Sequence, residues 1–514
     1  MVDDASRQFL RNLKDVVRNF RESVVRHGRP TSDRARTQTV VQNFFLHVHS
    51  ARIHEHSLKW STTLGMGLLT MAFFLILTVT GILLMVYYKP AVATAYDSIK
   101  DIQYVVPTGR VMRNVHRWAA HGMVLMVILH MARVFYTSAY KPPREFNWTM
   151  GMMLFVITLA LSFTGYLLPW DQLAYWAVTI GSNIAGSPRE LTDAVGLTQH
   201  FDPGGLIREG LLGAHFIGEE ALIRFYTLHV MVLPIALCVV VGAHFWRIRK
   251  DGGLARPAST QPPPGGPGAP ASASPQEAPS KSFGLMAVVH GRTAATNQEI
   301  ENTLPSWPRV FRIEAAVAMV VLLGTVLLSL WLDAPLKELA NPEIPENPAK
   351  APWYFLGLQE LVSYSAFMGG VVIPGIVVVG LALIPYLDRE QEDAGVWFSG
   401  PRGRRVALYS ALYGVLLCVG VLAFTVRFGW LRSWFPHIPQ IAITAFNPGT
   451  VFVLACAAWS IGLLRVTNST RMAAIGLFTC FLVCFLILTW FATVHRGPNW
   501  DFYWWPSQWP TAEH

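Results

Sequence analysis

Two stretches of the sequence decide the fold: RNVHRWAAHGMVLMVILHMAR at 113–133 and RFYTLHVMVLPIALCVVVGAHFWRIRKDGG at 224–253. Each contains an apolar run about 20 residues long, the length that a helix needs to cross the hydrocarbon core of a bilayer. Each also carries one histidine near either end of the run: His116 and His130 in the first stretch, and His229 and His244 in the second. Ionisable residues are costly inside a membrane and usually functional there. These four histidines are therefore the first candidates for a functional site.

The spacing of the histidines predicts which helix faces they occupy. His116 and His130 are fourteen residues apart, and His229 and His244 are fifteen apart. In a regular α-helix the first pair is separated by about 21 Å and about −40°, and the second by about 22.5 Å and about +60°. Each helix thus presents two histidines on roughly one face, one near each membrane surface. The two helices run in the same direction because one helix separates them. We therefore expect His116 to face His229. His130 should likewise face His244.

Composition places the chain in a membrane. Of its 514 residues, 52% are hydrophobic and 14% are charged, whereas an average soluble domain has about 25% charged residues. So few charges cannot cover a water-facing surface, which excludes a soluble enzyme and a disordered or fibrous protein. The net charge of +9 comes without a basic and aromatic stripe, so no nucleic acid is expected as a partner. All five cysteines fall in apolar runs without a C-x-x-C-H motif, which argues against covalent haem, zinc and a disulfide framework.

Nine apolar runs predict an all-α integral membrane protein with about nine transmembrane helices. They lie at roughly 62–88, 115–137, 148–168, 226–248, 312–332, 369–387, 404–427, 449–466 and 471–494. The loops rich in Lys and Arg all fall on one side of such a bundle, and the positive-inside rule makes that side cytoplasmic. We therefore expect the inner membrane of a bacterium, with the N-terminus in the cytoplasm and the C-terminus outside.

Two pairs of imidazoles stacked across a membrane suit two six-coordinate haems, each iron held by neutral ring nitrogens. Glycines reinforce this interpretation: Gly67 and Gly81 on the first helix are fourteen residues apart, and so are Gly151 and Gly165 on the third. Missing side chains at these two depths would let a flat macrocycle lie against the backbone. For a single histidine or glycine, ordinary core packing of helices is the alternative.

Arginines near the histidines are candidates for pairing with haem propionates. They are Arg113, Arg117, Arg133 and Arg224. Arg249, which follows the last histidine, is a candidate for attracting the charge of a propionate or of a bound quinone on the cytoplasmic side. For each of these arginines, anchoring at the membrane interface is the alternative.

The sequence resembles cytochrome b of the Rieske–cytochrome b (bc-type) quinol complexes. The resemblance rests on the two histidine stretches, on KPPREFNW at 141–148 and on TGYLLPWDQLAYWA at 164–177. The PWDQ form and the histidine spacing are closer to the plastoquinol-oxidising branch than to the mitochondrial one. The next three helices resemble the separate smaller subunit of that branch, here joined to the first half by a Pro-rich linker. The resemblance covers about residues 60–427.

The resemblance implies a di-haem cytochrome b subunit of a quinol:cytochrome c-type oxidoreductase coupled to proton translocation. Quinol would be oxidised outside and electrons would cross the membrane to quinone. The implied cofactors are two non-covalent haem b groups and quinone or quinol. The implied partners are a Rieske-type iron–sulphur protein, a c-type cytochrome, membrane lipid and a second copy of the chain in a homodimer.

One departure concerns the quinol-oxidation pocket. The family has a Pro-Glu-Trp-Tyr motif there, whose Glu takes a quinol proton, but this chain reads Ala351-Pro352-Trp353-Tyr354. The resemblance keeps Trp353 and Tyr354 as pocket residues. Proline cannot accept a proton, so the acceptor must differ. Glu360, about two helical turns further on, and Asp171, at the end of the third helix, are the candidates. For Glu360 a solvated interfacial carboxylate is the alternative.

These assignments divide the chain into five segments. They are a cytoplasmic amphipathic N-terminal segment (1–61), a four-helix di-haem cytochrome b domain (62–252), a Pro/Gly-rich cytoplasmic linker (253–311), a three-helix domain with the quinol-pocket loop (312–427), and two extra transmembrane helices with an aromatic outer tail (428–514). The tail, RGPNWDFYWWPSQWP at 496–510, is either an aromatic belt that anchors the last helix or a docking surface for a partner.

Two other functions remain open from the sequence. One is a di-haem b-type membrane anchor of a dehydrogenase or reductase, with one quinone site and no bifurcation of electrons. The other is a transporter whose histidines bind no metal, although no internal repeat of the kind common in transporters is visible.

Overall fold

The computed structural model describes residues 15, 17, 18, 30–43, 46–251, 253–255, 303–390 and 394–510. Within these residues nine helices are long and apolar enough to span a membrane, which confirms the predicted all-α membrane fold. They are Met66–Tyr87 (α6), Gly109–Tyr136 (α8), Glu145–Leu167 (α9), Glu219–Lys250 (α13, η2 and α14), Arg309–Trp331 (α16), Met368–Leu387 (η4 and α18), Pro401–Trp434 (α19 and α20), Gln440–Thr467 (α21 and α22) and Thr470–Val494 (α23). We call the two ends of the bundle inner and outer after the predicted orientation.

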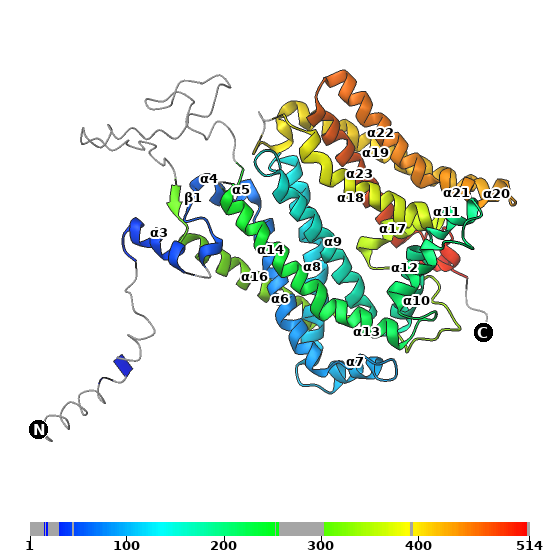
Figure 1. Ribbon diagram of the computed structural model, residues 1–514, viewed down its shortest axis with the longest axis horizontal. Coiled ribbons are helices and arrows are strands. Elements are labelled where there is room, and N and C mark those ends of the chain that lie inside the picture. The colour runs from blue at the N-terminus through cyan, green and yellow to red at the C-terminus, as the bar shows by residue number, and fades with distance from the viewer. Residues whose placement is uncertain are drawn as a thin grey trace, which may run out of the picture.

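The spanning helices form one bundle with two parts (Figure 1). Helices α6, α8, α9 and α14 make up the first part, and α16 packs against α6 and α8 on one side of it. Helix α18 packs on α9 and connects the first part to the second, in which α23 contacts α17 (Trp353–Tyr364), α19 and α22. Shorter helices cover the outer end: α7 (Ala95–Tyr104), α10 (Gln172–Gly186), α11 (Arg189–Ala194) and α12 (Pro203–Leu212).

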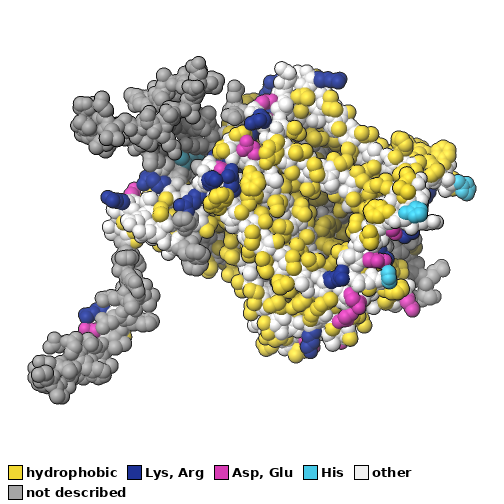
Figure 2. Space-filling view, in the orientation of Figure 1, with side chains coloured by type: hydrophobic (Ala, Val, Ile, Leu, Met, Phe, Trp, Pro, Cys, Tyr) yellow, Lys and Arg dark blue, Asp and Glu magenta, His cyan; other side chains and the backbone are white. Residues whose placement is uncertain are grey.

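The surface of the bundle suits lipid. Figure 2 shows hydrophobic side chains across the middle of the visible face and charged side chains mainly toward its edges. Large apolar residues on the spanning helices are well exposed, such as Val79, Val239, Val320 and Leu416, each more than half exposed. Water would penalise such a surface, whereas hydrocarbon leaves it without cost. The chain is an integral membrane protein.

The segment before the first spanning helix lies at the inner end of the bundle. It contains α3 (Asp33–Gln42), η1 (Leu46–Val48), β1 (Arg52–His54), α4 (Glu55–Leu58) and α5 (Trp60–Thr63). Strand β1 pairs antiparallel with β2 (Thr303–Pro305), and the Arg52 guanidinium donates to the carbonyl oxygen of Thr303 at 2.9 Å. Residues 303–311 therefore belong to β2 and the start of α16, and the predicted linker ends earlier than residue 311. Residues 256–302 lie outside the described part of the chain.

Helix α23 is the most buried of the nine spans and lies among the helices of the second part rather than beside them (Figure 1). The sequence analysis predicted two extra transmembrane helices at 428–514, but it did not predict that one of them is buried among the others. At its inner end Arg471, which is 1% exposed, donates to the Tyr140 hydroxyl at 2.9 Å and to the Phe135 carbonyl at 2.9 Å. The Tyr140 hydroxyl donates in turn to Asp388, whose carboxylate lies 3.8 Å from Arg471 and 3.6 Å from Lys141. This buried network joins α23, the α8–α9 turn and the end of α18.

Replacing Arg471 should destabilise the protein strongly. Arg471→Met leaves the buried Asp388 carboxylate with one cation fewer, and breaking a buried ion pair in this way costs about 3–5 kcal/mol. Arg465→Met in the same turn is the control, because Arg465 is exposed and such changes usually stay within about 0.5 kcal/mol. Thermal unfolding in detergent measures both. Equal unfolding temperatures for the two variants would contradict a structural role for the network.

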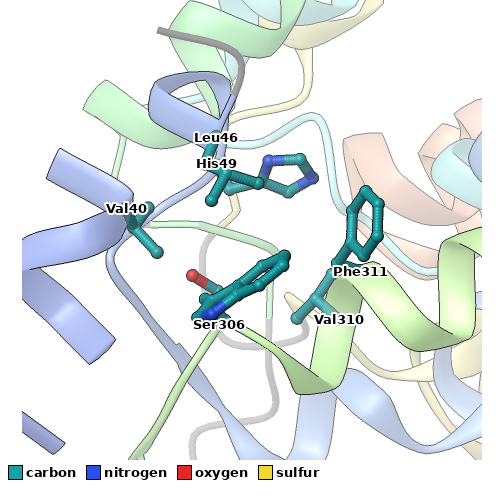
Figure 3. A pocket seen from close by; sticks show the side chains of 7 residues that line it. Val40, Leu46, His49, Ser306, Val310 and Phe311 are labelled. Atoms are coloured by element: carbon teal, nitrogen blue, oxygen red, sulfur yellow. The ribbon is translucent and has the colours of Figure 1, made fainter. Parts of the chain in front are cut away.

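His49 lines a small pocket at the inner end and pairs with a carboxylate on α16. Figure 3 shows His49 above Val40, Ser306 and Phe311, where η1 and α3 meet the start of α16. The His49 Nε2 atom lies 2.9 Å from the Glu314 carboxylate. This hydrogen bond raises the pKa of His49 above its ordinary value of 6.5, against the opposing effect of burial.

The contact between His49 and Glu314 should therefore depend on pH. Because the pKa of His49 is higher in the folded than in the unfolded protein, the contact stabilises the folded state fully at pH values below the unfolded pKa of about 6.5. This stabilisation is lost as the pH rises through the folded pKa. Hydrogen exchange of residues 30–50 should accordingly be slower at pH 6 than at pH 9, after correction for intrinsic exchange. His49→Gln keeps a hydrogen-bonding side chain without its titration and should remove the difference. The same pH dependence in both proteins would show that His49 is not responsible.

Candidate cofactor-binding site

The structure brings the four histidines predicted as ligands together in two pairs. His116 on α8 and His229 in η2 face each other near the outer end, with ring centroids 6.3 Å apart and ring planes at 78°. His130 on α8 and His244 on α14 line one cavity near the inner end. The pairs are those that the spacing predicts.

A π-helical turn explains why one spacing is fourteen residues and the other fifteen. Residues Leu228–Val232 (η2) are π-helical, and the Leu233 N–H donates to the Leu228 carbonyl, five residues back. Pro234 follows, and proline cannot donate the ordinary α-helical hydrogen bond. A π-turn adds one residue to the helix, so the fifteen residues act as about fourteen and the +60° offset predicted for a regular helix becomes about −40°. Both helices then present their histidines with the same offset.

Each histidine ring lies against a glycine on the neighbouring helix. A Cβ atom added to Gly165 would lie 2.5 Å from Cε1 of His229, and one added to Gly67 would lie 3.2 Å from Cε1 of His130. A Cβ atom added to Gly81 would lie 3.3 Å from Cε1 of His116, and one added to Gly151 would lie 3.9 Å from Cε1 of His244. The glycines were expected to admit a macrocycle. In the structure they admit the imidazole rings, because a side chain at Gly165 would occupy the place of the ring.

The outer pair has the separation that a shared metal requires. Bonds between a transition metal and imidazole nitrogen are about 2 Å long, so two imidazoles that bind one ion from opposite sides have centroids about 6 Å apart. The observed 6.3 Å matches this separation. Within the described residues no group of three or more His, Cys, Asp or Glu side chains forms a metal site of the ordinary kind. The pairs therefore fit a metal whose remaining ligands come from a cofactor such as haem.

The inner cavity has unpaired polar atoms that suit a bound group. Asn147 Oδ1 and His244 Nδ1 are buried and have no hydrogen-bond partner among the described residues. Arg133 and Arg144 also line the cavity, and Arg133 donates to the Thr62 carbonyl at 2.8 Å and 3.1 Å. Arg144 and Asn147 lie in the KPPREFNW stretch and were missed as site residues. Their positions, seven and four residues before Gly151 respectively, were the available signal.

The predicted propionate arginines divide into two groups. Arg117 fits the prediction: its Nε atom is buried without a hydrogen-bond partner among the described residues, and its guanidinium lies 5.3 Å from the Tyr166 ring centroid. Arg113 donates to the carbonyls of Ala334 and Pro335 at 2.8 and 2.7 Å. Arg113 therefore holds the loop before α17, and its role in binding a propionate stays a prediction.

Two further predicted arginines lie apart from the histidine rings. Arg224 donates to the Gly210 carbonyl and so connects α13 to the end of α12, and its role in binding a propionate stays a prediction. Arg249 is partly buried in the last turn of α14 at the inner end. Its position agrees with both alternatives, attraction of a negative group and anchoring at the interface.

The outer pocket residues Trp353 and Tyr354 begin helix α17 and face a histidine that the sequence analysis did not single out. The Trp353 indole N–H donates to Nδ1 of His121 at 3.0 Å, and the His121 and Tyr354 rings lie 5.8 Å apart. His121 lies on α8 between the two predicted ligands. Its five-residue distance from His116 gave no signal, because the partner that reveals it lies 232 residues away.

Asp171 is buried and holds the loop before α17. Its carboxylate accepts from the N–H of Ala174 at 2.9 Å, which caps α10, and from the N–H of Lys337 at 2.9 Å. The neighbouring Gln172 accepts from the N–H of Asn341 at 2.7 Å. Burial raises the pKa of Asp171, and the backbone hydrogen bonds oppose this rise. Each carboxylate oxygen accepts one backbone hydrogen bond, so Asp171 supports this loop, and its role as a proton acceptor stays a prediction.

Glu360 is fully buried, which contradicts the solvated alternative. Arg496 donates to its two oxygens at 2.5 and 2.9 Å, and Trp500 and Tyr364 donate at 3.0 and 2.8 Å. Four donors fill the carboxylate, and the role of Glu360 as a proton acceptor stays a prediction. Part of the aromatic tail is thus folded onto α17, whereas Trp504 and Trp505 remain 60% and 64% exposed.

Comparison with known proteins agrees with this arrangement. The model of the cytochrome b/b6/petB family matches residues 54–252. The chain is 44% identical to cytochrome b6 of Heliobacterium mobile over 187 residues, which are 36% of this chain and 82% of that protein. It is 43% identical to cytochrome b6 of Prochlorococcus marinus strain MIT 9515, over 36% of this chain and 80% of that protein.

A solved structure extends the likeness to the second part of the bundle. A chain of a hyperthermophilic respiratory complex III matches with a TM-score of 0.51 and 22% identity, over 83% of this chain and 90% of that one. At this identity the match concerns the fold. The family model covers the four helices that carry the paired histidines and the glycines against them, and the shared fold continues beyond these helices. This chain belongs to the cytochrome b/b6 family.

Proposed function

We propose that this chain is the di-haem cytochrome b subunit of a quinol:cytochrome c-type oxidoreductase. The observation that carries the proposal is the pair of facing imidazoles at each of two depths, every ring lying against a glycine. Quinol is oxidised at the outer side and electrons cross the membrane to quinone at the inner side, with proton translocation. The partners are a Rieske-type iron–sulphur protein, a c-type cytochrome and a second copy of the chain, in a bacterial inner membrane.

The histidines supply the ligands for this function. His116 and His229 hold one haem b, and His130 and His244 hold the other. A bound haem b supplies a one-electron redox centre whose potential the protein tunes. Arg117 at the outer site and Arg133 and Arg144 at the inner site supply cations for the propionates. The chain orients the rings through the glycines and keeps water out by burying the histidines among spanning helices.

The outer pocket binds quinol through the start of α17. Trp353 fixes His121, because the indole can only donate and therefore needs Nδ1 as its acceptor. The His121 proton is then on Nε2, which makes this nitrogen a donor to a quinol oxygen. Tyr354 supplies a hydroxyl and an apolar ring at the same place. Oxidation of one quinol releases two protons. One of them passes to the iron–sulphur partner, and Asp171 and Glu360 are the candidates on this chain for accepting the second.

A di-haem anchor without bifurcation is the second candidate. Pro352 stands where the family motif has Glu, and Glu360 is held by Arg496, which favours a pocket different from that of the relatives. The two candidates differ in stoichiometry. Bifurcation reduces inner quinone by one electron for every electron that reaches cytochrome c, whereas an anchor delivers both electrons along one path. The family assignment argues against the non-redox transporter.

The haem assignment predicts selective losses. Purified protein should carry two haems per chain that acid-acetone extracts, because no C-x-x-C-H motif binds them covalently. His116→Leu or His229→Leu should remove only the outer haem. His130→Leu or His244→Leu should remove only the inner one. Redox titration of the haem spectrum measures each loss.

His121→Leu is the matched control for these variants. It removes a membrane histidine from the same helix, and both haems should remain. A single haem in the unchanged protein would contradict the assignment. Loss of the same spectral component from the His116 and His244 variants would contradict the pairing.

The outer-pocket assignment predicts slower quinol oxidation with intact haems. His121→Leu and Tyr354→Leu remove a donor and a ring from the pocket, so the KM for decylubiquinol or menadiol should rise about tenfold, which corresponds to one hydrogen bond of about 1.4 kcal/mol. Stopped-flow reduction of the haems in the purified complex measures this effect. An unchanged KM in both variants would place quinol oxidation elsewhere.

A further inference from the structure

Two threonines contact the outer histidine pair in the same way. Thr80 precedes Gly81, and its Oγ1 atom lies 2.9 Å from Nδ1 of His116. Thr164 precedes Gly165, and its Oγ1 atom lies 3.2 Å from Nδ1 of His229. A Thr-Gly pair on α6 and another on α9 therefore each hold one histidine: the glycine admits the ring and the threonine bonds to it.

The hydrogen bonds of the threonines settle which atom donates. The Thr80 hydroxyl donates to the Ile76 carbonyl at 2.7 Å, and the Thr164 hydroxyl donates to the Ala160 carbonyl at 2.9 Å. A hydroxyl has one proton and two lone pairs, so each Oγ1 is left to accept from the imidazole. Nδ1 then carries the proton, and Nε2 carries the lone pair that a metal needs.

The inner pair has no such partners. The residues that precede Gly67 and Gly151 are Met66 and Met150, whose thioethers are weak acceptors. Nδ1 of His244 is buried and has no hydrogen-bond partner among the described residues. The two sites thus share histidines and glycines but differ in the group behind the ligands.

We propose that Thr80 and Thr164 are positioning residues that lower the reduction potential of the outer haem relative to the inner one. A hydrogen bond accepted from Nδ1–H makes the ligating nitrogen a stronger electron donor, and stronger donation favours the oxidised metal. Both histidines of the outer site have such a hydrogen bond, so both become stronger electron donors. The difference in potential favours electron movement from the outer to the inner site. The inference rests on the proposed function, because it requires haems at both sites.

Threonine-to-valine variants test the proposal, since valine has nearly the same shape and cannot accept a hydrogen bond. In redox titrations Thr80→Val and Thr164→Val should each raise the midpoint potential of the outer haem, with a larger rise in the double variant. The inner haem should not change. Thr80→Ser keeps the hydroxyl and should restore the original potential. Thr78→Val is the control on the same helix, because Thr78 is exposed and donates only to the Phe74 carbonyl.

A gain-of-function variant makes the test independent of damage at the outer site. Met150→Thr places a hydroxyl beside Gly151, where His244 lacks a partner, and should lower the potential of the inner haem. Unchanged potentials in the valine variants, or equal shifts at both haems, would overturn the proposal while leaving the di-haem assignment intact. A wild-type protein without haem at one of the sites would instead overturn the proposed function.

Discussion

The contact between an imidazole ring and a glycine on the next helix is the constraint on which the first part of the bundle depends. Gly165 lies so close to His229 that an added Cβ would be 2.5 Å from the ring. Any side chain there would push α9 from α14 or turn the ring away from His116. Since helix interfaces in membranes depend on close packing of small residues, one residue type both sets the helix distance and directs the ligand. The π-turn at η2 aligns the second histidine of that helix.

A buried charge network connects the second part of the bundle to the first. Helix α23 has one buried arginine at its inner end and another just past its outer end. Arg471 meets Asp388 and Tyr140, and Arg496 meets Glu360 on α17. Buried ion pairs are costly to break, so they set the depth and rotation of α23 precisely. Helix α17, which begins with the pocket residues, is held in turn by the ion pair between Arg496 and Glu360.

Much of this architecture could be predicted from local patterns. Apolar run lengths identify the nine spans, because a bilayer demands about 20 residues from each helix. The fourteen-residue spacing of His116 and His130 predicts two depths, because α-helical geometry is regular. The π-turn was beyond such a prediction, although Pro234 marks its place. The burial of Glu360 could not be predicted, because its partner Arg496 lies 136 residues away and no periodicity connects the two. His121 was missed for the same reason.

Electron cryo-microscopy of the purified complex tests the central claim most directly, because it shows what lies between the paired rings. The account predicts a planar density at each of two depths, one bounded by His116 and His229 and the other by His130 and His244, with the Gly81 and Gly165 backbones behind the outer rings. Imidazoles that pack directly against each other, or planar density at only one depth, would contradict it.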